Sequence, residues 1–94
     1  MNAETNIKHF QIGNTVITRN AATLLTEEDI SNGITRHQSG DWGDVCTEDF
    51  EVNNNSINTG RKLLSSYHSV RGVKFWIITE ADRQTTKVLL PEDY

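Results

Sequence analysis

The chain has 94 residues, 35% of them apolar and 23% charged, and its formal net charge is −4. This length fits one domain, 1–94, and the single cysteine, Cys46, excludes a disulfide framework and a multi-cysteine zinc site. The negative charge argues against broad nucleic-acid binding. No apolar run is long enough for a membrane span or a signal peptide, so we expect a cytoplasmic protein.

The first half of the chain predicts one strand and two helices. Residues 1–6 are expected to be a frayed terminus, and the apolar pattern from Phe10 to about Asn20 predicts a strand, with one helical turn possible after it. Thr26 is a good N-cap followed by three acidic residues, so a helix is expected from there to about Gly40.

A second helix is expected to begin at Thr47 and to end at Gly60, a residue suited to a C-terminal cap. Its centre, Asn53-Asn54-Asn55, is poor helix material, because asparagine amides compete for backbone hydrogen bonds. We therefore expect this helix to be short or irregular.

The last third, from about Leu63 to Leu90, predicts a three-stranded antiparallel meander, and the whole chain is therefore α+β. Turns are expected at Arg71-Gly72 and Asp82-Arg83-Gln84. The strand 73–81 is apolar on both faces, which is typical of a central strand. An exposed edge strand near Leu63 or Thr85 could pair two copies of the chain.

Charge is unevenly distributed along the sequence. Residues 27–51 hold eight acidic side chains and one base, whereas residues 61–87 hold six bases and two acids. One interpretation is that these regions pair with each other across the fold. The other is that the acidic region is a surface offered to a basic partner.

The segment 36–44 is the strongest candidate for a functional site. Its two glycines, Gly40 and Gly43, allow sharp turns that would let side chains converge. Trp42 offers a flat surface for stacking, or alternatively a plug for the edge of the core. The polar residues at the turn after the central strand are interpreted first as turn-forming residues and alternatively as a second functional cluster. The candidate binding residues of both clusters are Arg36, His37, Asp41, Trp42, Asp44, Glu80, Asp82 and Arg83.

A hydrolase or nuclease is a second hypothesis. His37 and His68 could act as a metal-independent acid/base pair, with Asp41 and Arg83 beside them, if the fold brings these side chains together. Cys46 as a nucleophile has weaker support, because a lone cysteine is more often a small buried residue. No spacing of metal-ligand residues and no phosphate or dinucleotide motif occurs, so no metal and no cofactor are expected.

Three stretches together resemble a family of short bacterial proteins described as plasmid-related, or loosely as a type I restriction enzyme subunit. They are HQSGDWGD at 37–44, Tyr67-His68, and KFWIITEADR at 74–83 with LLPEDY at 89–94. The resemblance implies a mobile-element context. The restriction label fits poorly, because one proline cannot supply the Asn/Asp-Pro-Pro-Tyr/Phe motif of a methyltransferase, and no nuclease Glu-x-Lys strand is found.

The favoured hypothesis is a non-enzymatic protein-binding module, in this context one that interferes with a host restriction or CRISPR complex. A DNA-binding regulator is the third hypothesis. It is the weakest, because the expected first helix begins with three acids, at the end that a recognition helix would point toward DNA.

Overall fold

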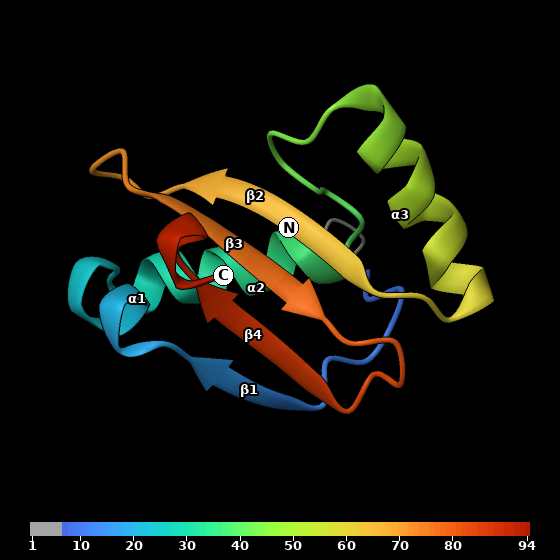
Figure 1. Ribbon diagram of the computed structural model, residues 1–94, viewed down its shortest axis with the longest axis horizontal. Coiled ribbons are helices and arrows are strands. Elements are labelled where there is room, and N and C mark those ends of the chain that lie inside the picture. The colour runs from blue at the N-terminus through green and yellow to red at the C-terminus, as the bar shows by residue number, and fades with distance from the viewer. Residues whose placement is uncertain (1–6) are drawn as a thin grey trace.

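The computed structural model describes residues 7–94, which form a four-stranded sheet with three helices (Figure 1). The expected frayed terminus, residues 1–6, lies outside the described residues. The strands lie in the order β1-β4-β3-β2, with β1 parallel to β4 and the other pairs antiparallel. Their bounds are β1 Asn14–Ile17, β2 Leu63–His68, β3 Lys74–Thr79 and β4 Thr85–Leu89. The predicted α+β fold and its meander are confirmed.

The helices are α1 (Arg19–Leu24), α2 (Glu27–Gln38) and α3 (Thr47–Thr59), and Pro91–Asp93 forms a short 3-10 turn. None of the helices formed by residues 7–94 combines the length and the apolar character that crossing a membrane requires.

Helix α2 lies behind the sheet and covers one of its faces (Figure 1). It begins as expected: Thr26 accepts from the amide of Asp29, and the Asp29 carboxylate accepts from the amide of Thr26. The helix lies against the side chains of β3 at Gly33, where an added Cβ would lie 3.0 Å from Ile77 and 3.1 Å from Phe75. Gly33 therefore lets the helix pack tightly on the sheet, at some cost in helix propensity.

The hydrophobic core lies between α2 and the sheet. Its buried members are Ala21, Leu25, Tyr67, Phe75, Ile77, Val88 and Leu90. The opposite face of the sheet is covered in part by the C-terminal turn, where the Tyr94 ring packs edge-on against Trp76. Asp93 holds this turn in place by accepting hydrogen bonds from Thr18 Oγ1 and Asn20 Nδ2, both at 2.7 Å. Strand β3 is thus central and contacted on both faces, as its sequence predicts.

The two edges of the sheet differ. Along β2, Ser66 donates its amide to the carbonyl of Trp42 and accepts from the amide of Asp44, so residues 42–44 pair with this edge. The Asn53 side chain pairs with Leu64 on the same edge. The β4 edge is occupied by β1. The strand near Leu63 is thus an edge strand, as one of the two expectations has it, but its outer backbone groups are engaged, whereas the strand near Thr85 is internal. Within residues 7–94 the open edge is β1.

Some boundaries differ from the expected ones. The N-terminal strand is limited to Asn14–Ile17, and β3 spans Lys74–Thr79 rather than 73–81. The first hairpin turn is centred on Val70-Arg71 and not on Arg71-Gly72, because the amide of Gly72 donates to the carbonyl of Ser69. Gly72 follows the turn with a φ of +88°. The expected short or irregular second helix is a regular helix of 13 residues that ends at Gly60.

Candidate functional site

The segment 36–44 divides into side chains that point inward and side chains that face solvent. His37, Gln38 and Trp42 are buried, whereas Arg36, Asp41 and Asp44 are exposed. The glycines that frame Asp41-Trp42 both have positive φ, at +84° and +75°. A Cβ at Gly43 would lie 2.0 Å from the carbonyl oxygen of Ser66, so only glycine fits this crossing of β2. The loop thus closes the edge of the core.

His37 belongs to a buried chain of hydrogen bonds, and the chain fixes its tautomer. Thr86 Oγ1 donates to the carbonyl of Ile12 (2.8 Å), so it must accept from Thr79 Oγ1 (2.7 Å). Thr79 in turn accepts from Nε2–H of His37 (2.9 Å), and Nδ1 of His37 accepts from the Ser65 hydroxyl (2.5 Å). The neutral imidazole with its proton on Nε2 satisfies every member of this chain.

Burial, assisted by the positive charge of Arg83, lowers the pKa of His37 to about 3. The ring has no solvent exposure and is packed edge-on by Phe10 and Trp42, at centroid distances of 5.1 and 5.5 Å. Both ring nitrogens already have partners. His37 is therefore a neutral core residue at physiological pH and has no access to a substrate.

His68 lies on the other face of the sheet. Side chains alternate along a strand, and Ser65 and Tyr67 of β2 point toward α2, so His68 points away from it. It is exposed, and its Nδ1 lies 2.9 Å from the carboxylate of Asp44. The structure does not bring His37 and His68 together, and the acid/base pair that the hydrolase hypothesis requires is not formed.

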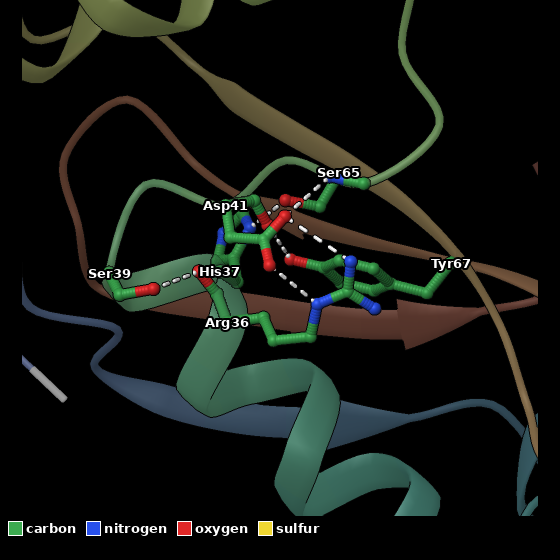
Figure 2. Close-up of polar contacts among 7 residues, drawn as sticks. Arg36, His37, Ser39, Asp41, Ser65 and Tyr67 are labelled. Atoms are coloured by element: carbon green, nitrogen blue, oxygen red, sulfur yellow. Dashed lines mark hydrogen bonds and ion pairs between the residues drawn. The ribbon is translucent and has the colours of Figure 1, made fainter. Parts of the chain in front are cut away.

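The exposed side chains of Arg36 and Asp41 form a cluster with the buried Tyr67 (Figure 2). Arg36 Nε and Nη2 lie 2.7 and 3.2 Å from the two oxygens of Asp41, and its guanidinium sits 4.5 Å from the centre of the Tyr67 ring. The hydrogen bond from Arg36 lowers the pKa of Asp41. Tyr67 donates its hydroxyl to the Asp41 carbonyl (2.6 Å), and burial raises its pKa. These groups position one another and leave few donors or acceptors for a ligand.

This cluster borders an open groove of ≈380 Å³ between α2 and the β2–β3 hairpin. The Asp29 carboxylate in the groove accepts from the amides of Thr26 and Val70. These hydrogen bonds, that with Thr26 foremost, lower its pKa. The charged groups of the groove are therefore largely engaged in holding the hairpin and the helix together.

The second candidate cluster, at the turn after β3, stabilises the fold. Glu80 pairs with Lys87 (3.3 Å), and Asp82 accepts from the amide of Gln84 (3.0 Å). Arg83 donates to the carbonyls of Ser56 (2.8 Å) and Arg61 (2.7 Å), at the C-terminal end of α3. Its cation suits the negative end of the helix dipole.

Arg83 approaches the 36–44 loop only from its inner side. The guanidinium lies 5.7 Å from the ring centre of Phe10, and Phe10 stacks on Trp42 at 6.0 Å. The structure thus separates Arg83 from the solvent-facing carboxylate of Asp41. Cys46 is exposed and precedes α3, and residues 7–94 contain no group of three or more His, Cys, Asp or Glu side chains able to hold a metal ion.

Helix α3 carries the surface that the sequence did not single out. Its only buried residues are polar, Asn53 and Ser56, whereas Phe50 and Val52 are 47% and 55% exposed. Polar contacts attach the helix: Asn53 pairs with the backbone of Leu64, and Trp42 Nε1 donates to Asn54 (3.0 Å). The helix stands out from the sheet at the β2 side (Figure 1).

The acidic region pairs with the basic strands only in part. Among residues 7–94, the salt bridges are Arg36–Asp41, His68–Asp44 and Lys87–Glu80. His68 of β2 is the side chain of residues 61–87 that forms such a bridge with residues 27–51, and the charge of Arg71 adds to the hydrogen bond from Thr26 in lowering the pKa of Asp29. The predicted pairing across the fold is therefore formed at these points and not along the whole acidic region. Glu48, Asp49 and Glu51 are exposed on α3, and Glu27 and Glu28 on α2. Acids at the start of α2 also disfavour its insertion into a DNA groove.

Comparisons with family models, with curated proteins and with solved structures find no match to this chain.

Proposed function

We propose that this protein is a protein-binding module and that the outer side of α3 is its contact surface. The observation that carries this proposal is the polarity of α3: its two fully buried side chains are asparagine and serine, Ile57 beside them is half-buried, and Phe50 and Val52 are left largely outside. A surface helix usually does the opposite and packs its apolar side chains on the core. Apolar side chains left outside on an ordered helix are suited to contact with another protein.

Helix geometry defines the shape of the contact. Successive residues are about 100° apart, so with Asn53 and Ser56 facing the sheet, Phe50 and Val52 lie on opposite flanks and Glu51 on the outer crest. A partner with a groove would contact both flanks at once, which is the helix-in-groove mode of recognition. Burying the exposed half of the Phe50 ring would contribute about 1 kcal/mol.

Charge supports a basic groove. Helix α3 contains Glu48, Asp49 and Glu51 and no lysine, arginine or histidine. None of these carboxylates forms a salt bridge within the part of the chain that the structure describes. A partner with lysine or arginine along its groove would therefore gain ion pairs and faster, electrostatically steered association.

The resemblance to plasmid-related proteins gives the proposal a biological setting. In a mobile element, a small protein that binds a basic protein surface could interfere with a host defence complex, whose nucleic-acid-binding subunits carry such surfaces. The proposed partner is therefore a subunit of a host restriction or CRISPR complex.

The test is capture of partners from the native host with tagged variants. Phe50→Ser and Glu51→Lys alter the α3 surface, and Val70→Ser and Glu92→Lys make the same chemical changes at exposed positions elsewhere. Glu51→Lys, Val70→Ser and Glu92→Lys change exposed side chains and are expected to unfold within about 0.5 kcal/mol of the wild type. Phe50→Ser also loses the half of the ring that is already buried, about 1 kcal/mol, and its folding is checked before the capture. We expect the α3 variants to lose a protein that the controls retain. Equal recovery by all four would refute the proposal.

A further inference from the structure

We propose a second binding site at the β1 edge of the sheet, opposite the β2 edge to which α3 is attached. The open edge of β1 and the groove beside it would take an extended peptide segment with aliphatic side chains at alternate positions and a basic residue at one end. The site is separate from α3 and does not depend on the function proposed for that helix.

The backbone of β1 offers hydrogen-bonding groups along this edge. Asn14 and Thr18 donate their amides to Gln84 and Val88, on the β4 side. Because backbone groups alternate along a strand, the N–H and C=O groups of Thr15 and Ile17 point away from β4. No loop or helix in residues 7–94 forms a backbone hydrogen bond with them. Such an edge is a template for an added strand.

The side chains of the same two residues line an apolar groove of ≈410 Å³. Its other wall is one stripe of α2, with residues recurring every three or four positions: Glu27, Ile30, Ser31, Ile34 and Thr35. Every second side chain of an added strand would point into this groove and contact Ile17, Ile30 and Ile34. Main-chain hydrogen bonds to an exposed edge, with pockets for alternate side chains, are the means by which several peptide-binding domains accept a strand.

Charge and composition favour a peptide over a second copy of the chain. Glu27 lines the groove, is exposed and has no salt-bridge partner in the described residues. A basic residue in the bound segment would pair with it. The β1 strand of a second copy is Asn-Thr-Val-Ile and carries no base to place there.

The probe is a short, blocked, fluorescent peptide that alternates threonine and valine and ends in lysine, with an otherwise identical peptide ending in glutamate as its control. We expect saturable binding with chemical-shift changes at the amides of Thr15 and Ile17 and none at His68. The lysine peptide should bind about threefold more tightly. The preference should reverse in Glu27→Lys.

A variant pair tests the backbone contact. Thr15→Pro removes the backbone amide that faces away from β4. Proline is tolerated at such a position of an edge strand, and Thr15→Val keeps the amide. Thr15→Pro should bind the peptide about tenfold more weakly than Thr15→Val, because the two variants both replace the threonine side chain and only the proline lacks the amide. Folding of each variant is checked by its β4 amide shifts.

Three results would overturn the proposal: absence of saturable shifts at β1, equal affinity of the two peptides, or a dimer that Thr15→Pro dissociates. The last would assign the groove to a second copy. Glu51→Lys on α3 should bind the peptide like the wild type, so failure here is distinguishable from failure of the α3 proposal.

Discussion

The side-chain amide of Asn53 pairs with both backbone groups of Leu64: Nδ2 donates to the carbonyl at 2.7 Å and Oδ1 accepts from the amide at 3.2 Å. The contact imitates one rung of a β-ladder. It fastens α3 to the sheet through polar groups, and it also occupies the outer edge of β2 at Leu64. The exposure of Phe50 and Val52 follows from this mode of attachment.

Asn53→Ala should therefore destabilise the protein by about 2 kcal/mol, because two backbone groups of Leu64 lose their partners. It should also uncover the β2 edge and promote self-association. Urea unfolding and sedimentation velocity measure the two effects. The control is Asn55→Ala, an exposed position of the same helix, where a change within about 0.5 kcal/mol and no association are expected. Equal behaviour of the two variants would contradict the role assigned to Asn53.

Replacement of His37 should affect folding, whereas replacement of His68 should not. His37→Ala leaves Ser65 and Thr79 with a missing partner and opens a cavity, at a cost of about 2–4 kcal/mol in the free energy of unfolding. His68→Ala removes an exposed side chain and should cost less than about 1 kcal/mol. Comparable losses in chemical denaturation would contradict the difference in burial described above.

The pH dependence of stability should also report on His37. Its pKa is about 3 in the folded protein and about 6.5 in the unfolded chain, so below pH 6.5 the unfolded state binds the additional proton. Stability present at neutral pH is lost as the pH falls, by about 2 kcal/mol between pH 6.5 and 5. His37→Gln should lack this loss over that interval. A wild-type unfolding free energy that stays constant from pH 6.5 to 5 would contradict a neutral, buried His37.

Arg83 combines two roles that substitutions can separate. Its φ is +61°, a conformation that glycine adopts without strain, and its guanidinium binds carbonyls of α3 and of the following loop. Arg83→Ala and Arg83→Gly both lose the guanidinium and should destabilise the fold. The glycine variant should be the more stable by about 1 kcal/mol in urea unfolding. The reverse order would show that the backbone conformation is misassigned.

Local signals predicted much of the fold. The sequence predicted the start of α2 at Thr26, the end of α3 at Gly60, the central position of β3 and the meander. These features could be predicted because caps, turns and periodicity depend on near neighbours. The regular, 13-residue form of α3 was not predicted. Its asparagines have low helix propensity, and their amides form hydrogen bonds with distant residues such as Leu64 that no local pattern reveals.

The candidate site was predicted only in part. Sequence identified 36–44 as unusual, but burial of His37 and Trp42 depends on long-range contacts with β2, β3 and α3. The parallel pairing of β1 with β4, which creates the open edge, joins segments about 70 residues apart along the chain. Composition did indicate the acidic surface, and only the structure shows that the basic strands leave most of its carboxylates without a salt bridge in residues 7–94.

The most direct test of the proposed function is photo-crosslinking in the native host. A photoreactive amino acid is placed at position 51, on the outer crest of α3, or at position 92, an exposed acidic position on the C-terminal turn. We expect position 51 to crosslink a discrete protein with a basic groove and position 92 not to do so. Crosslinks from position 92 alone, or from neither position when the partner is co-purified, would contradict α3 as the contact surface.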